Sequence, residues 1–437
     1  MQQRQETAGT GGSTPPVPAF RALWLEGIAA PVLLPEDPGL IEALCRCIHG
    51  WPSRLTSFDA GAANAPRPLC VIEAQGGGLY RASSRYVDDM LEDLHAATAI
   101  CVVLADLSQA YSETRDGHLF GLHCGGVVIG GRGIVIAGAK RAGKSTLVAR
   151  LSAMPEVEVL GDDVLPVAAD GTAIGLGLAP RLRLPLPRTA APAFRAHVES
   201  WLGPADDRYG YLLSPALAPH GRRVRVEAFV LLDRRSDAAA SLHVMPPDDV
   251  LHALVARSIT GPDGPEATFD AAQALASGLA GVRLVYSDLE EAAALIAAAF
   301  PADGRAAADA VALSPPLPAQ PPLPDHRRAT EIPPAAPCRR AQGVATRRMG
   351  EAAFLWQPGE AMLWHLNPVA QAIWTLLSRP RSARSVARIL QEAFPDEPPQ
   401  RLEDDTRALL AQLAQEGLVT LASRSGPAGR WLFDPVA

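Results

Sequence analysis

The segment 134–153 constrains most strongly what this chain can fold into. Four apolar residues at 134–137 lead into a glycine-rich turn, and a helix-like stretch follows at 146–153. The turn has the spacing G-x-x-x-x-G-K-S, in which backbone N–H groups at a helix N-terminus surround phosphate oxygens. The lysine of such a loop reaches the β- and γ-phosphates, and the serine hydroxyl holds Mg²⁺. The residues expected to bind the nucleotide are Gly138, Ala139, Lys140, Arg141, Ala142, Gly143, Lys144, Ser145 and Thr146.

The flanking strand and helix argue against the alternative, a glycine-rich turn with a chance Gly-Lys-Ser. We therefore expect a bound nucleoside triphosphate, with ATP and Mg²⁺ as cofactors.

Composition narrows the class of protein. A chain of 437 residues is long enough for two or three domains, and its net charge of −7 argues against a general nucleic-acid binder. No apolar run approaches the length of a membrane span, and residues 1–19 lack the apolar core of a signal peptide. Six cysteines show no metal-binding spacing. We expect a cytoplasmic protein with reduced thiols and a disordered leader over residues 1–19.

Alternating strands and helices follow the leader and predict an α/β fold. An N-terminal α/β region is expected over 20–115 and a P-loop catalytic domain over 116–300. The first is expected to contain a strand at 69–73, a helix at 86–96, and an apolar helix or buried strand at 97–107. The second is expected to contain strands at 134–137, 157–160 and 224–232, and a helix at 286–300 capped by Ser287 or Asp288.

Composition then changes sharply. Residues 301–342 are rich in proline and alanine, which is typical of a semi-rigid linker. A compact unit is predicted over 343–421, with a short tail at 422–437. Short strands are expected at 344–348, 352–357 and 361–365, followed by helices at 367–378, 382–394 and 399–416, the first capped by Asn367 with Pro368 behind it. Three strands and three helices in this order indicate a small winged-helix-like domain.

Three side chains near the phosphate loop are candidates for chemistry. His123 lies 15 residues before Gly138, and a predicted hairpin returns the chain so that His123 approaches the phosphates. Asp162 and Asp163 end the next predicted strand, and such strand ends face the ligand crevice of α/β sheets. One carboxylate would serve Mg²⁺, and the other would accept a proton from an attacking hydroxyl. The alternatives are an ordinary histidine and a solvated acidic turn.

These motifs resemble the catalytic domain of bacterial HPr kinase/phosphorylase, and more closely its relatives in ribosomal and lasso peptide biosynthesis. The resemblance covers roughly residues 20–300, and its specific motifs lie within 123–163. It implies that Lys144 and Ser145 take phosphate and Mg²⁺, that Asp162 and Asp163 share base and metal work, and that His123 orients one of them. The implied catalytic residues are Asp162, Asp163, His123 and Lys144, and the implied metal ligands are Ser145, Asp162 and Asp163.

The chain also departs from that family. The stretch 175–184 has no acid where the family has a glutamate-containing signature, which makes phosphorolysis and HPr as a substrate less expected than phosphorylation. Its Arg181 and Arg183 are instead candidates to neutralise phosphate charge, or are surface charges of an edge strand. Arg257 is a weaker candidate for the same work. Asp233 fits an apolar strand followed by Asp, and we interpret it as the end of a structural strand.

The C-terminal unit resembles the PqqD family of peptide-binding chaperones, which grip leader peptides in ribosomal peptide biosynthesis. The resemblance spans residues 343–421 and is most specific in Leu366-Asn-Pro-Val-Ala-Gln-Ala-Ile-Trp374. It implies that a leader adds as a strand to the edge at 361–365 and lies against the third helix. The expected groove wall includes Leu402, Asp405 and Leu409, whereas Ile373 and Trp374 are expected in the core. A nucleic-acid-binding winged helix is the alternative, but no basic recognition helix is evident.

Together these features predict an ATP- and Mg²⁺-dependent kinase for a serine or threonine hydroxyl of a precursor peptide. The peptide is expected to be captured by residues 343–421 and brought to the kinase site on the linker. Other peptide-maturation enzymes and a second copy of the chain are possible partners, while nucleic acid and membrane are not expected. Two alternatives stay open: ATP-dependent activation of a carboxylate or amide, and a nonenzymatic, nucleotide-gated module that delivers peptide.

Overall fold

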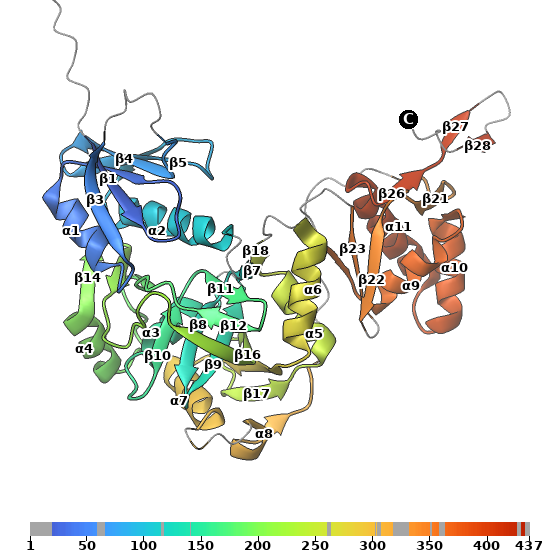
Figure 1. The fold of residues 1–437 in the computed structure, drawn as a ribbon. Coiled ribbons are helices and arrows are strands. Elements are labelled where there is room, and N and C mark those ends of the chain that lie inside the picture. Colours follow the sequence, from blue (N-terminus) through green and yellow to red (C-terminus); the bar gives the residue numbers. More distant parts are fainter. Residues whose placement is uncertain are drawn as a thin grey trace, which may run out of the picture.

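The computed structural model describes residues 20–58, 66–114, 118–139, 141–259, 264–301, 303, 307–317, 332–349, 352–357, 363–425 and 430–432. Three folded parts follow one another along the chain: an N-terminal part, a central part with the phosphate loop, and a C-terminal part (Figure 1). The predicted leader and Lys140 lie outside the described residues. In the described part of the chain, no helix combines the length and apolar character that a membrane span requires.

The N-terminal part is a six-stranded sheet with two helices packed against it, in strand order β3-β1-β2-β4-β5-β6. Its strands are β1 (Phe20–Leu25), β2 (Val32–Pro35), β3 (Ser53–Phe58), β4 (Cys70–Gly76), β5 (Leu79–Ser84) and β6 (Leu91–Leu94), and its helices are α1 (Pro38–Arg46) and α2 (Ala96–Ser112). The strand predicted at 69–73 is confirmed by β4. The helix predicted at 86–96 is wrong, because Leu91 and Leu94 pair with β5 as part of β6.

The apolar segment at 97–107, for which the sequence allowed a helix or a buried strand, is helical and lies within α2. Its buried residues Ala97, Ile100, Val103, Leu104 and Leu107 recur every three or four positions, which places them on one helical face. That face packs into the core, while the helix passes between the N-terminal sheet and the central part (Figure 1). The N-terminal part is therefore in contact with the region that holds the phosphate loop.

The central part is built on an eleven-stranded sheet. One path runs β10-β8-β9-β16-β12-β11-β7-β18, and β19, β17 and β20 extend it from β16. The strands are β7 (His118–Leu122), β8 (Gly125–Ile129), β9 (Arg132–Gly138), β10 (Glu158–Gly161), β11 (Leu165–Ala168), β12 (Thr172–Ile174), β16 (Arg223–Arg234), β17 (Ser241–Val244), β18 (Ser258–Ile259), β19 (Ala280–Tyr286) and β20 (Leu313–Ser314). Its helices are α3 (Lys144–Leu151), α5 (Pro247–Val255), α6 (Gly264–Ala276), α7 (Leu289–Ala299) and α8 (Ala307–Ala310).

Strand direction brings the predicted site residues to one edge of this sheet. Strands β8 and β9 form the predicted hairpin, and β10 is also antiparallel to β8, so β9 and β10 run in the same direction. Strand β16 is parallel to β9, with Leu232 opposite Gly138. The glycine-rich turn after β9 and the acidic pair after β10 therefore lie at the same sheet edge.

The helix predicted at 286–300 is confirmed by α7, and its cap is Asp288. The Asp288 carboxylate accepts hydrogen bonds from the backbone N–H groups of Glu290 and Glu291, as an N-cap should. The Ser287 hydroxyl instead donates to the carbonyl of Ala238. Of the two caps that the sequence allowed, only the aspartate has its side chain at the first turn.

A small separate sheet lies beside the phosphate loop. Its order is β13-β15-β14, with β13 (Arg181–Arg183), β14 (Leu202–Ala205) and β15 (Tyr209–Leu212), and helix α4 (Pro192–Trp201) precedes β14. The two candidate arginines thus stand on an edge strand. Arg181 and Arg183 are two positions apart, so both side chains leave the strand on the same face.

The C-terminal part has two three-stranded sheets and three helices. They are β22 (Ala345–Met349), β23 (Ala352–Trp356) and β24 (Trp364–Leu366) in one sheet, β25 (Arg381–Ser382), β21 (Pro337–Arg340) and β26 (Val419–Leu421) in the other, and helices α9 (Pro368–Leu376), α10 (Ala383–Ala393) and α11 (Pro399–Gln415). A further pair, β27 (Ser423–Ser425) and β28 (Arg430–Leu432), follows. The predicted cap is confirmed, since Asn367 accepts from the N–H of Ala370 with Pro368 behind it.

The predicted linker over 301–342 is partly folded at both ends. Strand β20 pairs with β17 of the central sheet, and β21 pairs with β26 of the C-terminal part. Residues 318–331, in the middle of this stretch, lie outside the described residues. The prediction extended the linker too far because short strands added to a distant sheet leave little trace in local composition.

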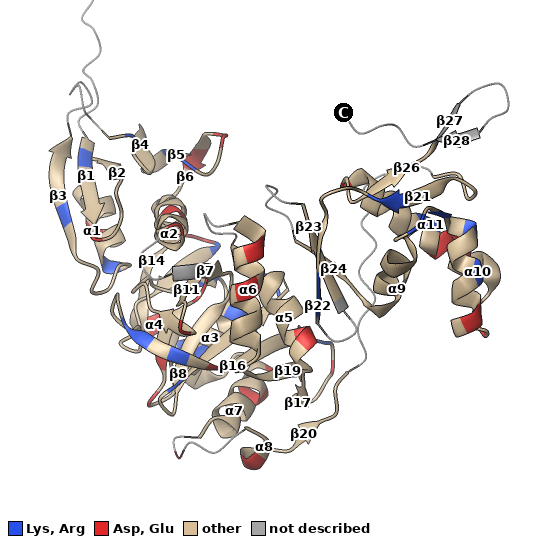
Figure 2. Cartoon of the chain, turned by 45° about the vertical axis from the view of Figure 1, so that its right-hand side comes forward, with Lys and Arg blue, Asp and Glu red and all other residues tan. Residues whose placement is uncertain are grey.

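The C-terminal sheet is docked on the central part. Figure 2 shows strands β22 to β24 standing between helices α5 and α6 on one side and helix α9 on the other. Alternation along β23 sends Ala353 and Leu355 into the C-terminal core, whereas Phe354 belongs to the core of the central part. Its ring centroid lies 5.0 Å from that of Phe269 on α6. The imidazole rings of His365 on β24 and His252 on α5 stack with centroids 3.6 Å apart.

Candidate functional site

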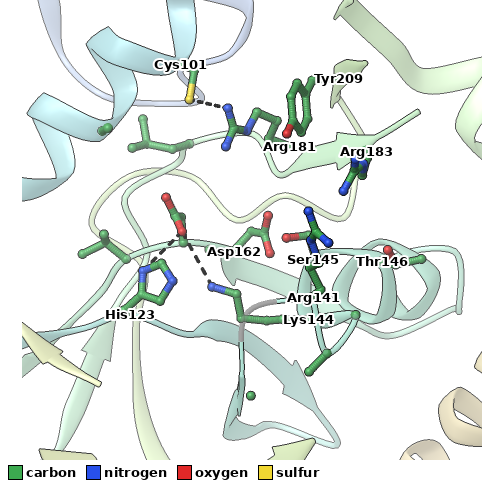
Figure 3. A pocket seen from close by; sticks show the side chains of 18 of the residues that line it. Cys101, His123, Arg141, Lys144, Ser145, Thr146, Asp162, Arg181, Arg183 and Tyr209 are labelled. Atoms are coloured by element: carbon green, nitrogen blue, oxygen red, sulfur yellow. Dashed lines mark hydrogen bonds and ion pairs between the residues drawn. The ribbon is translucent and has the colours of Figure 1, made fainter. Parts of the chain in front are cut away.

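A cavity of about 1120 Å³ lies at the sheet edge where β9 and β10 end. Most of its walls come from the phosphate loop, the acidic turn at 161–164, the small β13–β15 sheet and helix α2 of the N-terminal part, and His123, Arg234 and Arg257 complete the lining from other parts of the central sheet. Figure 3 shows the labelled side chains converging on this space from those elements. The N-terminal part is thus one wall of the candidate site, a role that its sequence did not indicate.

The buried side chain of Tyr286 supports the phosphate loop through a hydrogen bond. Gly143 has a φ of 94° and precedes Lys144, the first residue of α3. The Tyr286 hydroxyl donates to the carbonyl of Ala142. A Cβ at position 143 would lie 2.5 Å from the Tyr286 hydroxyl oxygen, so both the backbone conformation and the space require glycine there. Gly143 and Tyr286 thus fix the backbone conformation at the point where the loop enters α3.

Several buried polar atoms of the cavity lining have no hydrogen-bond partner among the described residues, and two of them lie beside the phosphate loop. These two are the Lys144 ammonium nitrogen and Oδ1 of Asp162. The Lys144 side chain is only 13% exposed and lies 3.7 Å from Asp163 Oδ1. Buried groups of this kind are costly unless a ligand completes them. A phosphate oxygen at the ammonium and a cation at the carboxylate would satisfy both atoms.

The two aspartates have unlike environments. Asp162 is buried, and burial raises its pKa to about 6, although Lys144 opposes this rise. A hydrogen bond from Ser145 acts in the same direction as Lys144 and joins Asp162 to the loop. Asp163 is 63% exposed toward the cavity, and its Oδ1 lies 3.4 Å from Nδ1 of His123. One carboxylate therefore faces the loop serine, and the other faces the open space.

The residues present fit a magnesium ion bound together with phosphates. Ser145 and Asp162 offer oxygen ligands beside the loop, which is the donor type that Mg²⁺ prefers. Across the described ranges, no group of three His, Cys, Asp or Glu side chains could hold a metal by itself. Mg²⁺ at nucleotide sites commonly takes one or two protein ligands and fills its shell with phosphate oxygens and water.

His123 follows β7 and reaches the site through the turn before β8. Its backbone N–H donates to the carbonyl of Arg257, 2.7 Å away. Burial lowers the pKa of His123, and Lys144 lowers it further. The imidazole is therefore neutral at pH 7 and can hold the Asp163 carboxylate through a ring N–H. The structure brings together His123, Asp163 and Lys144, as the hairpin argument anticipated.

The arginines of β13 line the cavity opposite the phosphate loop. The Arg181 guanidinium donates to Sγ of Cys101 on α2 and lies 4.6 Å from the ring centroid of Tyr209. Its backbone N–H bonds to Asp162. Arg183 is exposed and lines the same cavity.

Further arginines of the cavity had little or no sequence signal. Arg257, the weaker candidate of the sequence analysis, lines the cavity. Arg234 also lines it and is the last residue of β16, so the expectation that ligands bind at strand ends could have identified it. Arg208 had no such signal, because it lies in the turn before β15. Asp233 does not line the cavity and pairs instead with Arg235 at 2.7 Å, which agrees with a structural strand end.

The predicted peptide groove of the C-terminal part needs one correction. Ile373 and Trp374 are buried in the core as expected, at 3% and 2% exposure. Leu402, expected in the groove wall, is also buried, because positions 402, 406, 410 and 413 form the inner face of α11. Asp405 is exposed and Leu409 is half-buried on the flank of that helix. The edge strand predicted at 361–365 is described only from residue 363 on. Its last two residues belong to β24.

Comparison with known proteins agrees with this division of the chain. Residues 353–419 match the family described as "Coenzyme PQQ synthesis protein D (PqqD)". One solved structure that matches is TbiB1 in complex with the TbiA(beta) leader peptide, with 20% identity and a TM-score of 0.18, covering 18% of this chain and 93% of that one. Another is the PqqD truncation of Methylobacterium extorquens PqqCD, a recognition element for ribosomally synthesized and post-translationally modified peptides. It has 26% identity and a TM-score of 0.17, covering 19% of this chain and 87% of that one.

A third match covers a larger share of the chain. The Hpr(Ser) kinase/phosphatase from Coxiella burnetii shares 13% identity with a TM-score of 0.21, covering 40% of this chain and 91% of that one. None of the curated proteins matches this chain. The chain therefore has a central α/β part that carries the phosphate-loop sequence and a C-terminal part of which residues 353–419 match the PqqD family model.

Proposed function

We propose that this protein is an ATP- and Mg²⁺-dependent kinase that phosphorylates a serine or threonine hydroxyl of a ribosomally made precursor peptide. The observation that carries the proposal is the presence of two unlike carboxylates beside one phosphate loop. Asp162 is buried against Ser145, whereas Asp163 faces the open cavity next to His123. Phosphoryl transfer needs one carboxylate near the metal and one near the attacking hydroxyl, and unlike environments separate those roles.

The chain's own residues have defined roles in this reaction. The loop N–H groups and Lys144 hold the triphosphate in line with the acceptor. Asp163 accepts the hydroxyl proton while the oxygen–phosphorus bond forms and the bond to the β-phosphate oxygen breaks, leaving ADP. Neutral His123 fixes the orientation of the Asp163 carboxylate. Mg²⁺, when bound by Ser145, Asp162 and phosphate oxygens, neutralises charge that develops on the phosphates.

The PqqD domain supports peptide capture. A leader strand would add to the open edge of β24 and lie against the flank of α11 that carries Asp405 and Leu409. TbiB1, one of the matched structures, was solved with a leader peptide. Because the outer face of this sheet is docked on α5 and α6, the leader would be held at a fixed place relative to the cavity.

The test is the intact mass of precursor peptides encoded beside this gene, after incubation with the full chain, ATP and Mg²⁺. A gain of one phosphoryl mass is expected, and Lys144→Ala should abolish it. Asp163→Asn should lower transfer by about a hundredfold or more while MgATP still binds. Asp207→Asn, the same change at an exposed acid outside the cavity lining, is the matched control.

Capture by the PqqD domain is tested separately with point variants. Deleting the domain would uncover Phe269, so Leu409→Glu is preferable, with Val369→Glu on the exposed face of α9 as its control. Transfer that survives Asp163→Asn would overturn the base assignment. ATP consumption without a phosphopeptide would favour carboxylate or amide activation. Leader binding that responds to ATP, with no ATP consumed, would favour a nonenzymatic delivery module.

A further inference from the structure

We propose that the acceptor is recognised through a carboxylate close to the phosphorylated hydroxyl, and that Arg181, Arg183 and Arg208 bind this carboxylate. The inference rests on the proposed function and specifies the class of acceptor. It starts from the charge of the cavity, whose lining contains seven cationic side chains against the two carboxylates of Asp162 and Asp163. The seven are Arg141, Lys144, Arg181, Arg183, Arg208, Arg234 and Arg257. A magnesium-bound triphosphate offsets only part of this excess.

Six of the seven cations are divided between two walls, and the seventh, Arg257, lies beside His123, whose backbone N–H donates to its carbonyl. Arg141, Lys144 and Arg234 belong to the phosphate loop or to the strand end beside it, where the nucleotide binds. The second group, Arg181, Arg183 and Arg208, belongs to the small sheet, in which Arg181 pairs with Tyr211 and Arg183 with Tyr209. Figure 3 shows Arg181 and Tyr209 on the far side of Asp162 from Lys144. The small sheet therefore faces the loop across the acidic pair.

The three arginines of the small sheet have no carboxylate partner in the described part of the chain. No ion pair joins any of them to an acid there. The nearest sequence candidate, Asp206, is engaged elsewhere: its Oδ1 accepts from the backbone N–H groups of Arg208 and Tyr209, and its Oδ2 accepts from Thr98. Planar guanidinium groups match a carboxylate with two parallel hydrogen bonds. Apart from the Arg181 bond to Cys101, and with the charge of Asp163 nearby, this wall presents guanidinium groups that no carboxylate of the described residues pairs with.

The position of Asp163 indicates which molecule supplies that anion. Its carboxylate is 63% exposed, and Lys144 lies on its triphosphate side. The acceptor hydroxyl must reach Asp163 from the open side, which is the side of the small sheet and α2. Helix α2 contributes an uncharged wall of Cys101, Leu104, Ala105 and Ser108. The acceptor segment therefore passes between an uncharged helix and a cationic strand, and an acidic group beside the hydroxyl complements this environment.

The carboxylate has two possible sources, an acidic side chain next to the hydroxyl residue or the free C-terminus of the peptide. Four synthetic peptides separate them. Three are amidated hexapeptides, Ala-Leu-Ser-Xaa-Ala-Ala with glutamate, glutamine or lysine at Xaa, and the fourth is the tetrapeptide Ala-Leu-Ser-Gln with a free C-terminal carboxylate. Each is titrated by calorimetry into the full chain with Mg²⁺ and a non-hydrolysable ATP analogue. Either carboxylate probe should bind about tenfold more tightly than the glutamine amide, the value of one charge-assisted pair.

Variants assign the effect to the small sheet. Arg181→Gln and Arg183→Gln should each remove most of the preference for the carboxylate while leaving the affinity for the ATP analogue within about twofold. Arg54→Gln, an exposed arginine on β3 of the N-terminal part, removes the same charge outside the cavity and should change neither. Equal binding of the glutamine amide, the glutamate amide and the free-carboxylate peptide would overturn the inference. So would a preference that persists in both arginine variants, or loss of the ATP analogue in them, since the arginines would then serve the nucleotide.

The same mixtures with ATP separate this inference from the proposed function. A carboxylate preference that depends on Arg181 and Arg183, without phosphoryl transfer, would support the inference and contradict the kinase. Transfer to serine with no charge preference would do the reverse.

Discussion

Replacing Phe354 by alanine should release the PqqD domain from the central part without unfolding either one. Phe354 is fully buried, yet its ring contributes to the core of the central part rather than to that of its own domain. The opposite face of the same strand, with Ala353 and Leu355, remains packed against the helices of the C-terminal part. The substitution should therefore weaken the contact between the domains rather than the stability of the C-terminal part itself.

The magnitude follows from the contacts that Phe354 makes. Truncating a buried phenylalanine to alanine costs about 3–5 kcal/mol. The tilted pair with Phe269, at 5.0 Å, accounts for about 0.5–1.5 kcal/mol of that cost. A loss of about 3 kcal/mol raises the undocked fraction on the order of a hundredfold.

Calorimetry and hydrogen exchange test this expectation. A single unfolding transition in the parent should separate into two in Phe354→Ala, and amides of α6 around Phe269 should lose protection. Phe394→Ala, the same truncation at a side chain 38% exposed after α10, is the control and should change neither measurement. Unchanged protection of α6 and an unchanged single transition in Phe354→Ala would refute the docking as described.

Three further predictions concern single groups. Tyr286→Phe removes the hydroxyl bonded to Ala142 and should weaken MgATP binding about fivefold, measured by titration; an unchanged Kd would show that the loop needs no such support. Burial, and then His252, lowers the pKa of His365 to about 4, so docking favours the neutral ring: its contribution is complete above pH 6.5 and is lost as the pH falls toward 4. Exchange protection of α5 that is equal at pH 7 and pH 4.5 would contradict this. Burial raises the pKa of Asp106 to about 6, so the stability of the parent falls as the pH rises from about 4 to 6. The difference in unfolding free energy between Asp106→Asn and the parent, measured in urea, should therefore be about 1–2 kcal/mol more favourable to the variant at pH 7.5 than at pH 4. An equal difference at the two pH values would refute this.

Local patterns predicted many elements of the fold correctly, and the failures have physical causes. The phosphate loop, the β8–β9 hairpin and the Asn367 cap depend on residues close together in the chain. The segment at 91–94 was predicted as helix because its pairing partner, β5, is what makes it a strand. Leu402 was assigned to a groove because helical spacing shows which residues share a face, but does not show which way that face points.

The candidate site divides in the same way. Lys144 and the acidic pair were predicted from sequence because they follow strands whose ends meet at one sheet edge, and His123 because it precedes the hairpin strand that begins at that edge. Arg208 and the wall of α2 were not, because no spacing relates residues about a hundred positions apart.

The sequence by itself determined that the chain has a phosphate-loop motif, an acidic strand end and a compact C-terminal unit similar to the PqqD family. Each of these is written in a short segment, where glycine spacing, caps and alternation act through neighbouring residues. Only the tertiary structure decided that Phe354 of the C-terminal sheet enters the core of the central part, and that arginines from a separate small sheet face the loop across Asp162 and Asp163. Both depend on which surfaces come into contact, and burial against a distant element leaves no local pattern.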